Sequence, residues 1–373
     1  DPVKTADESD VLISIRAPVG DLNIADEHCC IGRGLAGLRP REINGLYLFY
    51  GLAERSRWLS RLASGSTFKS VSSADLEKVD LAVPPLPEQR KIASVLYTVD
   101  QAIQKTEAII EQAKRVKRGL MQDVFRLGID HSWSIRHPDA DSEQWQKTPL
   151  GRIPSSWEHV RLGDVVKRSG GLIQTGPFGS QLHQEEYVDE GVPVVMPQNI
   201  EDGKVDTTEI AQITPSKAEE LSRHRLRKND VVLARRGNLE RAAVITEEEE
   251  GWICGTGCLL IRLPVDEVDG SWFGAVYGYG IVQDQIMAQA VGSTMLNLNQ
   301  SILENLQLAL PPMHEQERIT SVLSRTDAKI EEEIELKLEL QSLKKGLMQD
   351  LLTGEVRTAD KAIEVLDEVE AHG

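Results

Sequence analysis

The chain has 373 residues, of which 40% are hydrophobic and 27% are charged, a composition typical of folded globular domains rather than of collagen or extended disorder. Its length suits two or three domains, and the sequence holds no run of about 18 apolar residues that would predict a membrane-spanning helix. Four cysteines are too few for a disulfide framework, and without a recognisable leader we expect a cytoplasmic protein.

The overall charge argues against a nucleic-acid partner, because 59 acidic residues outnumber 42 basic residues and give a net charge of −17. One segment departs from this balance. Residues 223–241 carry seven Lys or Arg against Asp230 and Glu240. A basic segment in an acidic chain can form a local surface that binds anions. The alternative interpretation is an ordinary solvated run of charges.

Residues 1–83 are predicted to be the C-terminal part of a β-rich domain. An apolar run from Val11 to Ile15 ends at Arg16, as in a strand followed by a turn. From Gly65 the chain reads GSTFKSVSSADLEKVDLAVPPLPEQRKI, and a closely similar sequence begins at Gly292. Self-similarity of this length indicates a repeated unit of one domain and one helix. The alternative is a duplication that serves only the structure.

Two long helices are predicted, over residues 84–128 and 311–354, one after each repeated domain. Prolines at the start of both segments suit a helix entrance, and Gly354 suits a helix end. Apolar residues recur at intervals of three and four, which predicts one apolar stripe on each helix. We expect the stripes to pack on each other as an antiparallel coiled coil, or on helices of a partner. Core packing within one globular domain is the alternative.

Between the helices, residues 129–153 are predicted to be a polar linker and residues 154–310 a second β-rich domain of the α+β class. Short apolar runs at Val231–Ala234, Ala242–Ile245 and Leu259–Ile261 are bounded by turn-forming and charged residues, as expected for buried strands. Residues 355–373 follow the second helix as an acidic C-terminal tail.

No catalytic or metal site is predicted. The glycine cluster of residues 170–179 lacks the lysine and the hydroxyl residue of a phosphate-binding loop. The Val-Pro-Pro and Leu-Pro-Pro triplets lack the leading Asn or Asp with which amino-methyltransferases hold the target nitrogen. Cys254 and Cys258 have too few companion ligands for zinc, so we expect them to pack in the core.

Residues suited to binding are better represented than residues suited to catalysis. Each repeat has an apolar strand that ends in an arginine-bearing turn, at Arg16 and at Arg235 with Arg236. Arginine can fork to a guanine edge or a phosphate, and Asn or Gln can pair with adenine. Ordinary surface polarity is the alternative for each residue. The predicted DNA contacts of this kind are Arg235, Arg236, Asn238, Arg241, Gln198, Asn199, Arg223, Arg16, Arg33 and Lys69.

Five segments between Pro154 and Arg357 carry a resemblance to a known family. In order, they read PSSWEHVRLGDVV, TGPFGSQL, GVPVVMPQNI, NDVVLARRGN and LPPMHEQERI, the last followed by a long helix and GLMQDLLTGEVR. They are similar to one target-recognition domain and the following helix of the specificity subunit of type I restriction-modification enzymes. The second segment adds Thr175 and Ser180 to the predicted DNA contacts.

The resemblance implies an α+β protein with two mixed α/β target-recognition domains, the first incomplete, each followed by a long helix. It also implies that each domain reads one half of a split site in double-stranded DNA. The helices would hold the domains apart and dock two methyltransferase subunits together with restriction/translocase subunits. The residues predicted to contact these partners are Leu120, Met121, Leu347 and Met348. S-adenosylmethionine, ATP and Mg²⁺ are expected on the partner subunits, whereas this chain is expected to bind no cofactor and to catalyse nothing.

The first repeat begins at a position equivalent to about Asn229 of the second, so counterparts of residues 155–229 are missing from it. Half of a β-rich domain would expose apolar surface and unpaired strand edges. We therefore expect either that the gene product begins upstream or that another polypeptide completes the domain. Recognition of a half-site through Arg16, Arg33 and Lys69 would then be incomplete.

Two other functions stay open on the sequence. The duplicated helices could join two protein partners without DNA, as a coiled-coil scaffold. The chain could also be an enzyme such as a methyltransferase, although it lacks a recognisable cofactor loop.

Overall fold

The computed structural model describes residues 4–55, 70–137, 145–168, 170–201, 203–290 and 297–357. The chain divides into two compact units, the first made of residues 1–113 and 329–373 and the second of residues 114–328. Two long helices, α4 (Leu86–Leu127) and α10 (Met313–Leu352), contribute to both units. Both helices lie within the segments predicted to be helical. Within the described parts of the chain, no helix is long and apolar enough to span a membrane.

The first unit contains a three-stranded antiparallel sheet. Its strand order is β3 (Leu22–Ile24), β2 (Val11–Ser14), β5 (Leu35–Leu38). The other elements are the antiparallel pair β1 (Thr5–Ala6) and β4 (Cys29–Cys30), and the helices α1 (Gly45–Glu54) and α3 (Ser73–Leu76). Asn44 fixes the start of α1, because its side chain accepts a hydrogen bond from the backbone N–H of Tyr47.

The core of the first unit lies between α1 and the parts of α4 and α10 that belong to this unit. Lys344 pairs with Asp100 at 2.6 Å and Lys337 pairs with Glu107 at 2.9 Å. Residue numbers rise along α4 as they fall along α10, so the helices run antiparallel here, as the apolar stripes predict. The buried apolar residues of this core are Tyr47, Tyr50, Ile92, Ala93, Val95, Leu96, Val99, Ile103, Leu340, Leu347, Leu351 and Leu352.

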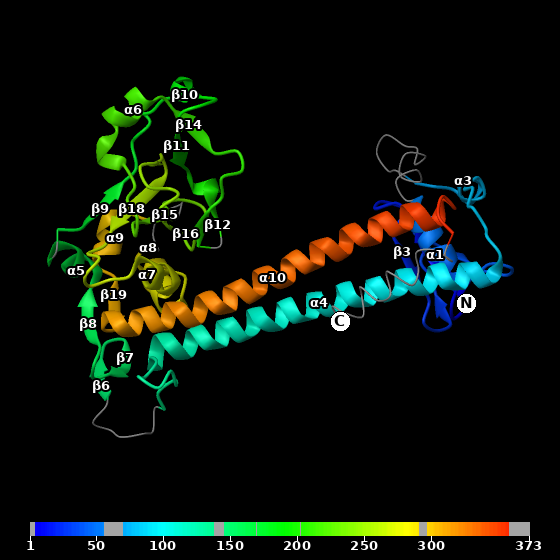
Figure 1. Cartoon of the computed structure of the whole chain (residues 1–373), viewed down its shortest axis with the longest axis horizontal. Helices are drawn as coiled ribbons and strands as arrows, with labels where there is room; N and C mark the ends of the chain where they lie inside the picture. The colour runs from blue at the N-terminus through cyan, green and yellow to red at the C-terminus, as the bar shows by residue number, and fades with distance from the viewer. Residues whose placement is uncertain are drawn as a thin grey trace. The chain divides into compact units, whose positions relative to one another are not determined.

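The second unit is built on a four-stranded antiparallel sheet (Figure 1). Its strand order is β16 (Ala242–Val244), β15 (Val231–Ala234), β18 (Cys258–Arg262), β9 (Leu172–Thr175). All of β15 and nearly all of β18 are buried, which explains why these strands read as continuous apolar runs. The three strands predicted from the sequence are therefore confirmed, with small shifts of their ends. Helix α7 (Gly270–Tyr277) packs beside β15 and β16.

A second four-stranded sheet adjoins the first within this unit. It consists of β10 (Tyr187–Val188), β14 (Ala211–Ile213), β11 (Val192–Val195) and β17 (Ile253–Cys254), and only the pair of β11 with β17 is parallel. The two-stranded pairs are β8 (Glu158–Arg161) with β19 (Gln307–Leu310), β12 (Ile200–Glu201) with β13 (Lys204–Val205), and β6 (Trp145–Thr148) with β7 (Gly151–Pro154). The remaining α-helices in the described part of this unit are α5 (Leu162–Arg168), α6 (Pro215–Glu220), α8 (Gly280–Ala290) and α9 (Gln300–Glu304).

The segment predicted to be a plain linker, residues 129–153, contains more structure than expected. Strands β6 and β7 form a hairpin, and β7 begins directly after the turn at Gly151, whose φ of +100° lies in the region that favours glycine. Earlier in the segment, Ile129 and Ile135 form a single antiparallel bridge. Neither feature was predicted, because these mostly polar residues lack the alternating apolar pattern that indicates a strand.

The internal repeat is reproduced in the hydrogen bonding of the two units. In the first unit, Gln89 accepts a hydrogen bond from the N–H of Asn44, which caps α1, and donates to the carbonyl of a proline before α4. In the second unit, Gln316 makes the same bonds to Asp269, which caps α7, and to a proline before α10. The sheets differ, because β18 lies between β15 and β9, whereas β5 pairs with β2 alone among the described strands.

Candidate nucleic-acid interface

Several of the predicted DNA contacts gather at one end of the central sheet of the second unit. Ala234 at the end of β15 lies opposite Cys258, and the N–H of Gly176, just after β9, donates to the carbonyl of Cys258 at 2.9 Å. The C-terminal ends of β9 and β15 therefore lie at the same end of the sheet. Two connections begin at this end of the sheet. They are the loop after β15, residues 235–241, and the turn after β9, residues 176–181.

The loop of residues 235–241 is anchored by one buried residue, while most of its polar residues are exposed. Leu239 is buried, and its carbonyl accepts a hydrogen bond from the hydroxyl of Tyr277 at 2.7 Å. Asn238 Oδ1 accepts from the N–H of Glu240 at 3.0 Å, and Gly237 takes φ +77°. Arg236 and Asn238 are exposed. A bulkier residue at position 237 would strain the loop, because its φ lies in the left-handed region.

Arg235 and Arg241 have structural contacts in addition to any role in binding. Arg235 is half-buried, and its Nε donates to Asn297 Oδ1 at 3.0 Å and to the carbonyl of Leu298 at 3.1 Å. Arg235 therefore fixes the chain just before α9, and only its remaining N–H groups could face a ligand. Arg241 is exposed, and its Nη1 donates to the carbonyl of Pro197 at 3.2 Å.

The turn of residues 197–199 separates two predicted contacts that adjoin in the sequence. Gln198 is exposed, whereas Asn199 is only 2% exposed. Asn199 Oδ1 accepts from the N–H of Met196 at 3.1 Å, and its Nδ2 donates to the carbonyl of Asp206 at 3.2 Å. The prediction of a DNA contact is thus wrong for Asn199, because its amide is buried and its hydrogen bonds hold the turn together.

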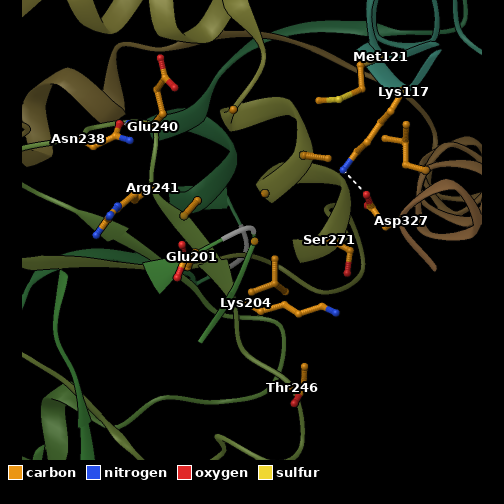
Figure 2. A pocket seen from close by; sticks show the side chains of 17 residues that line it. Lys117, Met121, Glu201, Lys204, Asn238, Glu240, Arg241, Thr246, Ser271 and Asp327 are labelled. Atoms are coloured by element: carbon orange, nitrogen blue, oxygen red, sulfur yellow. Dashed lines mark hydrogen bonds and ion pairs between the residues drawn. The ribbon is translucent and has the colours of Figure 1, made fainter. Parts of the chain in front are cut away.

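A hollow of about 620 Å³ lies beside this loop (Figure 2). Asn238, Glu240 and Arg241 lie on one side of it, and Lys117 and Asp327 form an ion pair on the other. Its other charged lining residues are Glu201 and Lys204. Three cations and three acids thus line the hollow, so its charge is mixed rather than uniformly basic. The amide of Asn238 also lines it.

Lys117 and Lys204 were not among the predicted contacts. Lys117 lies within α4. In the sequence, a lysine at such a position indicates only a solvated helix face. Lys204 begins β13 directly after Gly203, which has φ +82°. The Asp-Gly-Lys sequence is a recognisable hairpin signal, but only the tertiary structure brings Gly203 and Lys204 to the hollow that Arg241 also lines.

Three other predicted contacts lie toward the β9 side of the sheet. Thr175 is half-buried at the end of β9, and Ser180 is exposed in the turn that follows. Arg223 is exposed, and its carbonyl accepts a hydrogen bond from Gln174 Nε2 at 3.1 Å. Gln174 Nε2 also lies 2.8 Å from Nδ1 of His224, where burial, followed by the charge of Arg223, lowers the pKa of the imidazole.

In the first unit, Arg16 and Arg33 are both exposed at one sheet end. The N–H of Ile15 donates to the carbonyl of Gly34 at 2.9 Å, which brings the two arginines to neighbouring segments. The second unit has the same bond from Arg235 N to the carbonyl of Gly257, also at 2.9 Å. The arginine-bearing sheet end is therefore a feature of both repeats. Lys69 lies outside the described residues.

The four predicted partner contacts are less exposed than expected. Leu120 and Met121 are half-buried against the core of the second unit, and Met348 is half-buried against the core of the first. Leu347 is 5% exposed and belongs to the core of the first unit. The prediction is wrong for Leu347, because the apolar stripe of α10 that contains it is covered by residues of this chain itself.

The cysteines and the described acidic and histidine side chains do not form a metal site. Cys254 and Cys258 are buried as free thiols, which confirms that they pack in the core. A hydrogen bond between them and burial raise the pKa of Cys258, so its thiol stays protonated. Over the parts of the chain that the structure describes, no group of three or more His, Cys, Asp or Glu could hold a metal ion.

Comparison with known proteins gives one consistent family. The family model described as "Type I restriction modification DNA specificity domain" matches residues 3–115 and 154–340. This match confirms the resemblance inferred from the motifs.

The curated relatives share this family. The putative type I restriction enzyme MjaX specificity subunit of Methanocaldococcus jannaschii is 39% identical over 32% of this chain and 29% of its own length. The MjaVIII specificity subunit of the same organism is 24% identical over 84% of this chain and 71% of its own length. The chain thus spans less than a third of the first relative. Both relatives are named as specificity subunits of type I restriction enzymes.

Solved structures agree on the fold. The S subunit of a type I restriction-modification system from M. genitalium matches with a TM-score of 0.58 and 17% identity, over 93% of this chain and 83% of that chain. A structure described as the basis of complex assembly and conformational transition of the type I R-M system matches with a TM-score of 0.57 and 19% identity, over 95% and 84%. The predicted α+β class with paired long helices is confirmed.

Proposed function

Because the chain belongs to the family of type I restriction modification DNA specificity domains, we propose that it reads a bipartite target in double-stranded DNA. In this proposal, the second unit reads one half of the target and the first unit takes part in reading the other. The chain also acts as the scaffold that brings methyltransferase and restriction/translocase subunits to that DNA.

The observation that carries the proposal is the arginine-bearing sheet end that occurs in both units. Arg16 follows β2 and Arg236 follows β15, and the same backbone hydrogen bond joins each strand end to a glycine-containing turn. Two equivalent surfaces in one chain suit a site with two separated halves. Neither surface is strongly basic, so we expect the isolated chain to bind DNA weakly and the assembly to bind it more tightly.

In the second unit, the exposed loop supplies the chemistry of base recognition. Arg236 and Arg241 can each donate a fork of two hydrogen bonds to guanine, and Asn238 can exchange two with adenine. Glu201 and Glu240, which line the hollow beside Arg241, would repel phosphates that approach in a wrong register. Lys204, which lines the hollow together with Arg241, and Arg223, which lies beside Gln174 of β9, are assigned to the phosphate backbone.

The long helices α4 and α10 supply the scaffold in this proposal. Two methyltransferase subunits bring S-adenosylmethionine, and the restriction/translocase subunits bring ATP and Mg²⁺. Such contacts would involve three half-buried residues of these helices. Leu120 and Met121 pack against the core of the second unit, and Met348 packs against the core of the first. The site of action in this proposal is the cytoplasm, where cellular DNA lies.

The proposal is tested by DNA binding of the reconstituted assembly. If Arg236 makes a bidentate base contact, R236A should weaken binding to the specific site by about 1–3 kcal/mol and relax specificity at one position. R223A should instead weaken binding evenly across sequences and reduce the salt slope by about 1.

The control is R161A, since Arg161 is exposed on β8, outside the central sheet. Methylome sequencing of cells that carry the system should show a split methylated motif. A continuous motif, or salt-independent binding that R236A and R241A leave unchanged, would count against DNA reading and favour a scaffold without DNA.

A further inference from the structure

Each unit contains one copy of the same ion pair between α4 and α10. The offset between the two copies of the repeat aligns Asp100 with Asp327 and Lys117 with Lys344. In the first unit, Lys344 Nζ lies 2.6 Å from Asp100 Oδ1. In the second unit, Lys117 pairs with Asp327 Oδ1. The surroundings of the two pairs can therefore be compared residue by residue.

In the first unit, a tyrosine ring completes this pair. The hydroxyl of Tyr50, in α1, donates to Asp100 Oδ2 at 2.7 Å, and Lys344 Nζ lies 5.6 Å from the centroid of its ring. Tyr50 is buried. Burial, followed by the hydrogen bond to Asp100, raises the pKa of Tyr50, so its hydroxyl stays protonated as a donor. The lysine and the carboxylate thus hold an aromatic ring between them.

In the second unit, an alanine stands at the position of this tyrosine. Tyr50 is the sixth residue after Asn44, which caps α1, and Ala275 is the sixth residue after Asp269, which caps α7. The equivalence is supported by geometry, because the backbone N–H of each cap donates to a glutamine near the start of a long helix. Position 275 therefore supplies neither a ring nor a hydroxyl to the second ion pair.

The hollow of about 620 Å³ lies at this position in the second unit (Figure 2). Ala275, Lys117 and Asp327 all line it. The side chain of Asp327 is 42% exposed, whereas that of Asp100, which bonds to Tyr50, is 22% exposed. Ligand pockets have volumes of about 300–1,000 Å³. The second unit thus keeps the lysine and the carboxylate but leaves the place of the ring open.

The charges of the hollow suit an uncharged molecule. Lys117 and Asp327 neutralise each other, and two further cations and two further acids line the hollow, namely Lys204, Arg241, Glu201 and Glu240. A phosphate or a carboxylate would therefore gain no net attraction from the lining. The lining offers both hydrogen-bond donors and acceptors, including the amide of Asn238. A polar ring with donors and acceptors of its own matches such a lining.

We propose that the hollow is a binding site for a nucleobase that carries an amino group. The ring would take the place that Tyr50 fills in the first unit, beside Lys117, and its amino group would donate to Asp327. The ring nitrogens would accept from donors of the lining, which a simple phenol would leave without an acceptor. The base could belong to a free nucleoside or to an unpaired nucleotide of DNA. The site itself does not depend on the proposed function.

The test measures the binding of adenosine to the full chain by isothermal titration calorimetry. Adenosine should bind at a single saturable site. N6,N6-dimethyladenosine keeps the ring but lacks the amino N–H groups, so it should bind about tenfold more weakly or worse, because a hydrogen bond to a charged group is lost. Adenosine monophosphate should bind no more tightly than adenosine, because the lining has no excess of positive charge.

Variants of the hollow locate the site. A275Y should weaken the binding of adenosine by about tenfold or more, because the new ring takes its place, while the unfolding temperature should not fall. Position 274 is unsuitable for this purpose, since a Cβ atom at Gly274 would lie 2.7 Å from Val244 Cγ2. The matched control is A288Y, because Ala288 is exposed on α8 of the same unit and does not line the hollow.

A second variant tests the role of the carboxylate without filling the hollow. D327A should bind adenosine and its dimethyl analogue with equal affinity, because neither finds the acceptor of the amino group. The ion pair with Lys117 is partly exposed, so its loss should affect stability little. A D327A variant that still prefers adenosine over the analogue would overturn the assignment of Asp327.

The two sources of the base are distinguished with a single-stranded adenine oligonucleotide. If the base comes from DNA, the oligonucleotide should displace adenosine and A275Y should weaken its binding. If the ligand is a free nucleoside, the oligonucleotide should not displace adenosine. Both results support a nucleobase site, whereas a lack of saturable adenosine binding, equal affinity for the two nucleosides, or equal loss with A275Y and A288Y would overturn it. Tighter binding of adenosine monophosphate would overturn the choice of an uncharged ligand.

This inference and the proposed function fail independently. R236A should weaken binding of the assembly to its specific duplex but should leave adenosine binding unchanged, because Arg236 does not line the hollow. An assembly that does not read duplex DNA while its chain still binds adenosine would reject only the DNA-reading proposal. Specific duplex binding without adenosine binding would reject only the nucleobase site.

Discussion

Removing Asp230 should destabilise the sheet that carries the candidate interface. Arg262 donates to Asp230 through Nε at 2.9 Å and Nη2 at 2.6 Å, and Nη2 also reaches the carbonyl of Arg225. The side chains of Asp230 and Arg262 are only 2% and 17% exposed. D230A therefore leaves a mostly buried guanidinium without its counter-charge, and the N–H of Arg227 loses its acceptor. Breaking a buried pair in this way costs about 3–5 kcal/mol.

The repeat supplies an internal control for this prediction. Asp10 accepts the same fork from Arg39, at 3.1 and 2.9 Å. Arg39 is 56% exposed and also contacts Asp7, so D10A leaves its charge in water and should cost clearly less. Replacing both partners of the buried pair, as D230A with R262M, should recover part of the lost stability, because no charge is then buried alone.

Hydrogen exchange of backbone amides measures the two effects separately. In D230A, the amides of β15 and β18 should exchange at least a hundredfold faster, since each 1.4 kcal/mol corresponds to about a factor of ten. In D10A, the amides of β2 and β5 should change much less. Two results would refute the argument that burial determines how much stability is lost. One is an equal increase in amide exchange in the two sheets, and the other is a double variant D230A with R262M that is no more stable than D230A.

Three further predictions concern single side chains. Gln316 is fully buried and bonds to Asp269 N, to the carbonyl of Glu267 and to that of a proline before α10, so Q316L should lower the free energy of unfolding by about 1–3 kcal/mol, and an unchanged denaturant midpoint would contradict this. The pKa of His224 is held below its usual 6.5 by burial and then by Arg223, so its contribution to stability is full above pH 6.5 and is lost as the pH falls through the lowered value; H224Q should abolish that loss in thermal unfolding at pH 5 to 7, and an NMR titration of His224 above 6.5 would refute it. The pKa of Asp130 is lowered first by the Ser132 hydroxyl, so the turn of residues 130–134 is favoured above the usual value of 3.8 and loses this support as the pH falls through the lowered value; S132A should shift the carboxyl titration of Asp130 upward, and an unmoved titration would show that the Ser132 bond is absent in solution.

The long helices and the buried strands could be predicted from the sequence because their signals are local. Three- and four-residue spacing of apolar side chains predicts α4 and α10. The continuous apolar run Val231–Ala234 predicts a strand buried on both sides. The exposure of Arg236, Asn238 and Arg241 could also be predicted, since a polar loop that follows a buried strand lies at an end of the sheet. The repeat itself is visible in the letters of the chain, and the structure repeats it in the glutamines that join Asn44 and Asp269 to the following helices.

The sequence by itself thus determined the two long helices, the buried strands between Val231 and Ile261, the duplication and the family, since each depends on patterns of neighbouring residues. Only the tertiary structure decided which polar and apolar side chains are available to a ligand. Asn199 and Gln198 are adjacent, yet one amide closes a turn inside the protein and the other reaches the surface. Leu347 belongs to a stripe that could have faced a partner, but residues of α1 and α4 cover it. Exposure depends on packing against residues distant in the sequence, and local patterns contain no record of that packing.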